Sequence, residues 1–130
     1  MDRAFENEMK VLINTTDVAF SQMMWREGLH SGFFSMQLLR DSYRDWCTKT
    51  GTPVHKELIL RFIRAQTIML APICPHFSEH IWALLGETGS VLKTRWPEAG
   101  GVDGWMSRSF QFLTKTLRSF RLSLVKVRAR

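Results

Sequence analysis

The densest group of reactive side chains in the sequence lies between residues 74 and 80. His76 and His80 are four residues apart, so they share one side of a helix, and Cys74 stands just before them. Histidine nitrogen and cysteine sulfur are ligands that zinc prefers. A zinc protease motif needs a glutamate directly after its first histidine, but Phe77 stands there. Because no further ligand has matching spacing, we predict no metal site.

Other enzymatic signatures are equally incomplete. Cys74 and His76 are two residues apart, and side chains at that spacing on a helix do not face each other, which disfavours a nucleophile–base pair. The glycines at 100, 101 and 104 follow no predicted strand, so they do not form a phosphate-binding loop. Two cysteines, Cys47 and Cys74, are too few for a disulfide scaffold, and we expect both to be reduced and buried. We therefore predict no catalytic or cofactor-binding residue in this chain.

The C-terminal quarter of the chain is strongly cationic. Residues 105–130 contain seven Lys or Arg and no acidic residue, whereas residues 1–104 contain 11 basic and 12 acidic ones. On a helix, Arg108, Lys115 and Lys126 lie nearly opposite an apolar face, with Arg118 and Arg130 at the flanks. The apolar face comprises Phe110, Leu113, Leu117, Phe120, Leu124 and Val127. A helix with one dry face and one cationic face suits a polyanion such as RNA, although a merely solvated face is the alternative.

A second basic group is predicted near the middle of the chain. Its members are Arg40, Tyr43, Arg44, Lys49 and Lys56. Arginine offers a planar fork for phosphates, and a tyrosine can stack on an unpaired base or bond a phosphate.

Local ion pairing is the alternative interpretation of these charges. Asp41 and Asp45 are close enough in sequence to pair with the arginines at positions 40 and 44. Arg61 and Arg64 have a similar setting, with Glu57 one turn before Arg61, and we expect both to be structural.

Apolar periodicity predicts helices throughout the chain and no strand. Capping-type residues at 14–17 predict a break after the first helix, and the pair Pro72 and Pro75 predicts a kink between two later ones. The second proline suits the first turn of a helix that carries Trp82, which we expect to be buried. The predicted helices span 2–13, a short segment after 17, 25–49, 55–71, 75–85 and 105–130, with a loop at 86–104 that holds an apolar plug of Val91, Leu92 and Trp96.

Composition sets the class of protein. The chain has 130 residues, 45% of them hydrophobic, with five Trp and nine Phe, so it is long and apolar enough for one folded domain spanning 1–130. Its longest apolar run, near Ile68–Cys74, is too short to span a bilayer. No basic segment followed by an apolar one opens the chain, so we expect a cytoplasmic protein without a signal peptide.

Several motifs resemble one known family in both order and spacing. They are Asp2–Phe5, the Phe33–Arg44 segment, His55–Leu58, Arg61–Ile63, Leu70–Trp82 and Arg95–Pro97. Together they resemble the helical anticodon-binding domain of class I aminoacyl-tRNA synthetases for leucine, isoleucine, valine and methionine. The pair Glu79–His80 resembles the leucine branch of the archaeal and eukaryotic cytosolic type.

The resemblance implies an all-α bundle of about five helices that belongs to a larger synthetase. It also implies contact with the anticodon-arm side of tRNA(Leu), mostly through phosphates and shape. The ATP-binding elements of class I enzymes are not found, so ATP, Mg²⁺, the catalytic core and the editing domain are expected N-terminal to this segment. The rival interpretations are a helical module that docks an acidic protein, and the equivalent domain of an isoleucine, valine or methionine enzyme.

Overall fold

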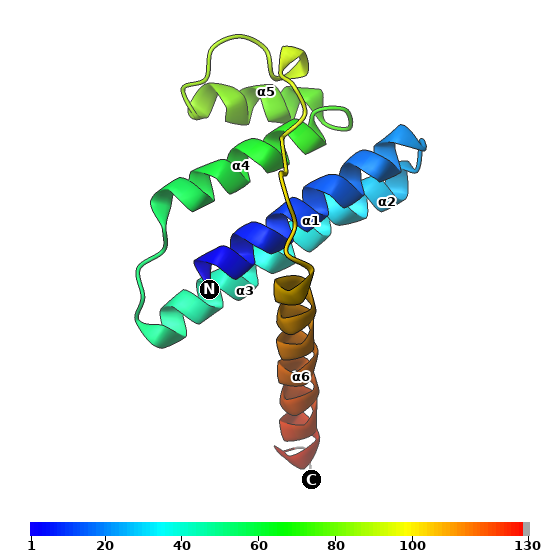
Figure 1. Cartoon of the computed structure of the whole chain (residues 1–130). Coiled ribbons are helices and arrows are strands. Elements are labelled where there is room, and N and C mark those ends of the chain that lie inside the picture. Colours follow the sequence, from blue (N-terminus) through cyan, green and yellow to red (C-terminus); the bar gives the residue numbers. More distant parts are fainter. Residues whose placement is uncertain (129–130) are drawn as a thin grey trace.

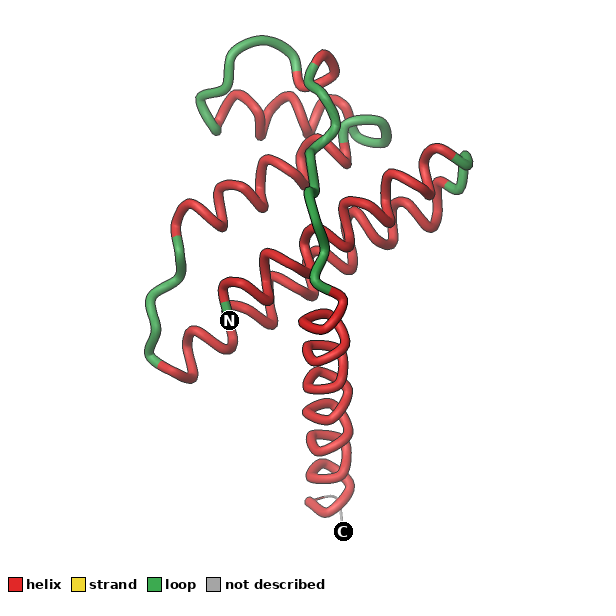
Figure 2. Tube along the Cα trace, viewed as in Figure 1, coloured by secondary structure: helices red, strands yellow, loops and turns green. Residues whose placement is uncertain are grey.

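The computed structural model describes residues 1–128, which form helices joined by loops, with no strand in that range (Figures 1 and 2). This confirms the predicted all-α class. Three segments in the middle of the chain, α2, the π-helical η1 and α3, follow one another without a break and form a single rod. The elements are α1 (Asp2–Ser21), α2 (Trp25–Leu29), η1 (His30–Ser35), α3 (Met36–Thr50), α4 (Lys56–Leu70), α5 (Pro75–Leu84), the 3₁₀ turn η2 (Val91–Lys93) and α6 (Gly104–Arg128).

The first helix is longer than the sequence indicated. The break predicted at residues 14–17 is wrong, because α1 continues through it. The hydroxyls of Thr15 and Thr16 donate to the carbonyls of Val11 and Leu12 at 2.8 and 2.7 Å. Within a helix, a threonine hydroxyl can hydrogen-bond to the carbonyl one turn earlier. Thr15 and Thr16 therefore fit inside α1 and do not end it.

Small residues bring α1 close to the rod that runs antiparallel to it. A Cβ atom on Gly28 would lie 2.1 Å from the ring of Phe20, and one on Gly32 would lie 2.9 Å from the Thr16 methyl. The Ser31 hydroxyl lies 2.8 Å from the Thr16 hydroxyl at the same buried contact. A larger residue at Gly28 would therefore displace the Phe20 ring, and one at Gly32 would displace Thr16 at the helix contact.

The predicted starts of the next two helices are confirmed. The His55 ring accepts the backbone N–H of Leu58 at 3.3 Å and caps α4. Pro75 occupies the first turn of α5, where the absence of an N–H costs nothing. The α4–α5 bend therefore follows from the two prolines, as the sequence predicted.

Two apolar clusters hold the bundle together. The main core joins α1, α3 and α4, and the smaller one joins the end of α4, α5 and η2 around Trp82, which is 7% exposed and confirms that prediction. Leu92 is exposed rather than part of the plug, and Cys74 is exposed in the α4–α5 turn rather than buried. The main core comprises Phe5, Met9, Ile13, Met36, Leu39, Tyr43, Cys47, Phe62, Ala65, Met69 and Ala99.

The last helix does not join the bundle along its length. Figure 1 shows α6 projecting away from the other helices, and only its first turns touch them, through Ser107 and Phe110. The predicted dry face is therefore exposed from Leu113 to Val127. None of the described helices is both long enough and apolar enough to cross a membrane.

Candidate nucleic-acid interface

The exposed cations of α6 form one long surface. Arg108, Lys115, Arg118 and Lys126 are all exposed, and the first and last lie about 27 Å apart at 1.5 Å per residue. The Arg108 guanidinium lies 5.0 Å from the centre of the Trp105 ring. Among the side chains that the structure describes, the ion pairs involve Lys10, Arg40, Arg44, Arg61 and Arg64, and none involves Arg108, Lys115, Arg118 or Lys126. Arg130 lies outside the described residues.

A buried asparagine fixes the origin of α6. The Asn7 amide donates to the Asp103 carbonyl at 3.0 Å and to the Ser107 hydroxyl at 2.9 Å, and its oxygen accepts the Asp103 N–H at 2.7 Å. The Asp103 carboxylate caps the helix by accepting the N–H groups of Trp105 and Met106. No local pattern marks Asn7 for this role, because its partners lie 96 and 100 residues away.

Arg40 and Arg44 lie together on α3 and share one carboxylate. Asp41 accepts hydrogen bonds from Arg40 at 3.1 and 2.8 Å, and Arg44 approaches the same oxygen at 3.4 Å. The Arg40 hydrogen bonds, with the charges of both arginines, lower the pKa of Asp41. Asp41 offsets only part of the charge of the two arginines, the exposed Asp45 follows Arg44, and the Arg44 side chain is 64% exposed.

Tyr43 lies in the core, so its predicted stacking on a base is wrong. Its side chain is 1% exposed and its ring stacks on Phe5 with centres 4.5 Å apart. The phenol donates to Asp2 at 2.9 Å and accepts the His55 N–H at 3.3 Å. Burial, together with the Asp2 contact, raises the pKa of Tyr43 to about 12. The apolar stripe to which the residue belongs faces α1 and α4, which leaves no room for a nucleotide.

Lys49 and Lys56 flank the turn between α3 and α4, and both are exposed. On α3, Lys49 lies roughly 140° around the helix axis from Arg44, at 100° per residue. The structure therefore does not bring Lys49 onto the Arg40–Arg44 side, although both lysines remain accessible.

The structural roles expected for Arg61 and Arg64 are confirmed, with different partners. Arg61 donates to Glu6 of α1 at 2.6 Å, and Arg64 donates to Glu87, which follows α5. The sequence suggested Glu57 as the partner of Arg61, but in the described ion pairs Arg61 binds Glu6 instead. Helix packing therefore brings carboxylates that are distant in the sequence to both arginines.

The cysteine and histidines near the start of α5 do not form a site. Cys74, His76 and His80 are all exposed, and residues 1–128 contain no cluster of three side chains able to hold a metal ion. Glu79 accepts hydrogen bonds from the Ser90 hydroxyl and from the Val91 N–H, and these lower its pKa. The Glu79 carboxylate therefore fastens η2 to α5, which is a structural role.

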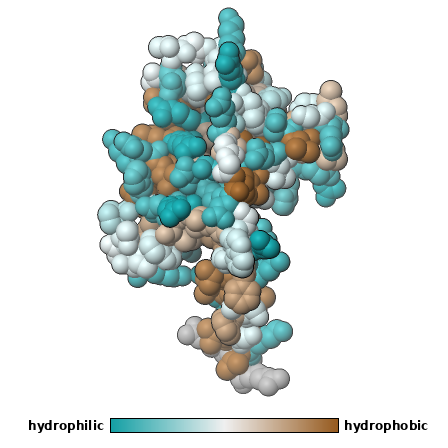
Figure 3. Space-filling model, viewed as in Figure 1, coloured by the Kyte–Doolittle hydropathy of each residue, from teal (hydrophilic) through white to brown (hydrophobic). Residues whose placement is uncertain are grey.

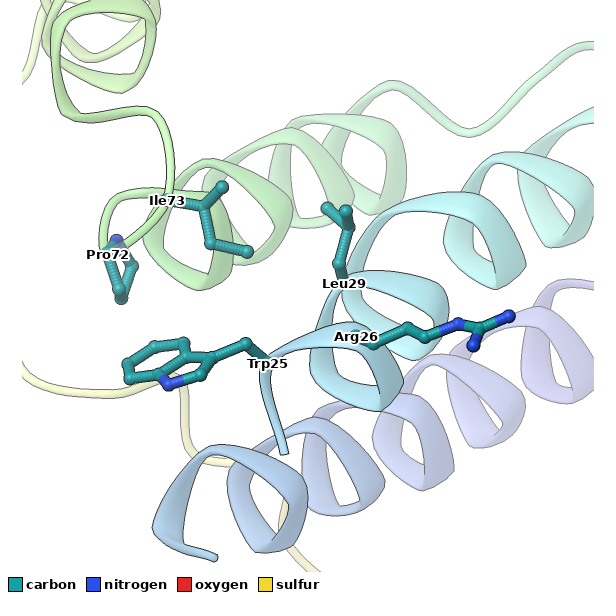
Figure 4. Close-up of a pocket in the computed structure, with 5 residues that line it drawn as sticks. All are labelled: Trp25, Arg26, Leu29, Pro72 and Ile73. Carbon is teal, nitrogen blue, oxygen red and sulfur yellow. The ribbon is translucent and has the colours of Figure 1, made fainter. Parts of the chain in front are cut away.

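A hollow of about 470 Å³ lies between α2 and the α4–α5 turn. Figure 4 shows the Trp25 ring beneath Pro72 and Ile73, with Leu29 beside them and the Arg26 side chain directed away. This lining is almost wholly apolar and contains no carboxylate or histidine. It therefore has no groups for acid–base or nucleophilic catalysis.

Comparison with known proteins agrees with the resemblance. The family described as anticodon-binding domain of tRNA ligase matches residues 2–129. The chain is 42% identical to the cytoplasmic leucine–tRNA ligase of Pongo abelii over 123 residues, which is 95% of this chain and 10% of the relative. It is 37% identical to that of Saccharomyces cerevisiae over 122 residues, 92% of this chain and 11% of the relative.

A leucine–tRNA ligase of Aeropyrum pernix is also similar, at 29% identity over 98 residues, 75% of this chain and 10% of the relative. The chain spans about a tenth of the length of these curated relatives. The family match covers the chain from the first residue of α1 to the end of α6, and the motifs lie within it from Asp2 to Pro97. The chain belongs to the family of tRNA ligase anticodon-binding domains, in the branch formed by the leucine–tRNA ligases.

Proposed function

We propose that this domain holds the anticodon-arm side of tRNA(Leu) within a cytoplasmic leucine–tRNA ligase and so positions the acceptor end in a distant active site. The main support for this proposal is the exposed cationic surface of α6. The sequence contains no acidic residue from position 104 to 130. Cations that are not paired with a carboxylate keep their charge available to displace the counterions of RNA phosphates. The family match supports RNA as the polyanion.

The contacts divide into two groups. Arg108, Lys115, Arg118 and Lys126 of α6 form the first group. The second group consists of Arg40 and Arg44 on α3, together with Lys49 and Lys56, which lie at the following turn and away from the Arg40–Arg44 side. The second group presents no exposed aromatic ring, whereas in the first the exposed Trp105 ring lies against Arg108. We assign most of the affinity to phosphate and shape contacts.

ATP and Mg²⁺ belong to the catalytic core of the proposed ligase. The residues of this chain do not fit them, because residues 1–128 hold no metal-binding cluster, and the glycines at 100, 101 and 104 precede α6 without the strand that a phosphate-binding loop follows. No chemical step of aminoacylation is therefore derived for this chain.

The test is tRNA(Leu) affinity as a function of salt in the full-length ligase. Replacing Arg108, Lys115 and Lys126 by Gln removes three charges, and each lost phosphate contact flattens the slope of log K against log salt by about 0.7 to 0.9. The double change Arg40→Gln and Arg44→Gln is measured separately. Exposed charges contribute little to stability, so circular dichroism is expected to show an intact fold.

A matched control removes three exposed charges elsewhere, by replacing Arg3, Lys93 and Arg95 with Gln. This control is expected to leave both affinity and slope near the wild-type values. If both test variants keep the wild-type slope, affinity and aminoacylation while remaining folded, these surfaces do not hold RNA, and docking of an acidic protein becomes the better explanation.

A further inference from the structure

Seven of the apolar residues of α6 follow a strict pattern, while Trp105, Phe112, Leu122 and Val125 are exposed outside it. Met106, Phe110, Leu113, Leu117, Phe120, Leu124 and Val127 recur at alternating intervals of four and three residues. That spacing forms the a and d positions of a coiled-coil heptad, and we call these seven residues the α6 seam. It is the pattern of a helix that packs lengthwise against another helix.

Nothing in the described chain covers most of this seam. Met106 and Phe110 are partly buried at the bundle, whereas the five members from Leu113 to Val127 are each at least 56% exposed. Figure 3 shows hydrophobic side chains gathered along the projecting helix in the lower part of the view. A continuous apolar stripe of this length marks a contact surface.

The edges of the seam indicate the charge of its partner. Ser109, Thr116 and Ser123 line one edge, and Thr114 and Arg121 line the other. These side chains are small or cationic, so another helix can approach closely and can place carboxylates beside the seam. A second copy of α6 would instead bring together two helices that lack any acidic residue.

We infer that the α6 seam is the docking surface for another helix of the same ligase polypeptide, one with an apolar stripe flanked by acidic residues. This inference rests on the proposed function for the identity of that polypeptide, because the relatives are about ten times longer than this chain. The seam and the cationic surface lie on opposite sides of α6. One helix can therefore bind protein along the first side while it faces RNA along the second.

Alkylation of single cysteines in the full-length ligase tests the inference. Leu117→Cys places a thiol on the seam, and Leu122→Cys places one on the opposite side, in a background of Cys74→Ser. The two leucines form a matched pair, since they are 56% and 55% exposed in the isolated chain. Modification of each site is followed by peptide mass spectrometry, and Leu124→Cys serves as a second seam position.

In the full-length ligase without tRNA, the cysteines at 117 and 124 are expected to react about tenfold or more slowly than the cysteine at 122, because alkylation then requires local opening. In the isolated 130-residue chain the rates are expected to be similar. Equal rates in the ligase would overturn the inference. Protection that appears only with tRNA would assign the seam to RNA, and protection in the isolated chain that grows with its concentration would assign it to a second copy.

The readouts also separate this inference from the proposed function. Thiol protection is measured without tRNA and does not depend on the salt slope. If the seam is protected but the α6 charges do not affect tRNA affinity, the docking surface is supported and the RNA contact is refuted. The reverse result would refute the docking surface alone.

Discussion

Asn7→Ala is expected to release α6 from the bundle. The change removes three hydrogen bonds, two to Asp103 and one to Ser107. At about 1 kcal/mol for each bond, docking of the segment weakens by about 3 kcal/mol. That energy corresponds to roughly a hundredfold rise in the opening equilibrium of the α6 base. The loss is local, because α1, α3 and α4 keep their shared core.

Hydrogen exchange of the backbone amides measures this opening directly. The amides of residues 103–110 are expected to lose about a hundredfold in protection, while those of α4 change little. Asn14→Ala is the control, since Asn14 is exposed on the same helix and its replacement gives the same gain in helix propensity. If Asn7→Ala and Asn14→Ala show equal protection at residues 103–110, the Asn7 bridge does not position α6 and the reasoning is refuted.

Three further predictions concern the core and the rejected metal site. Trp82→Ala is expected to lower the free energy of unfolding by about 3–5 kcal/mol, and urea melts that coincide with those of wild type would contradict the core assignment. The contribution of Tyr43 to the free energy of unfolding is expected to be full below pH 10 and to be lost between about pH 10 and 12, because the unfolded chain loses the Tyr43 proton near 10 while the folded chain holds it to about 12. Tyr43→Phe is expected to abolish that part of the pH dependence in denaturation curves measured across the range. Zinc or a chelator is expected to leave the thermal midpoint unchanged, whereas a fall of several degrees with chelator would reveal a structural metal.

Much of the fold could be predicted from the sequence, because it depends on interactions between residues that are close in the chain. The prolines at 72 and 75 determined the α4–α5 bend, because they remove backbone donors and clash with a preceding turn. Apolar periodicity determined that the chain is helical and that Trp82 faces inward. The motifs from Asp2 to Pro97 were sufficient to indicate the family, since their order and spacing survive without any knowledge of contacts.

Contacts between distant residues decided the rest. Tyr43 belongs to an apolar stripe, but only the packing of Phe5 and the position of Asp2 show that its ring is enclosed and closed to RNA. Arg61 pairs with Glu6 across 55 residues, a partner that no local pattern specifies. Amphipathic spacing shows that α6 has an apolar face but not what covers it. Only the tertiary structure shows that Asn7 holds the start of α6 while the face beyond stays open, because burial depends on which elements meet in space.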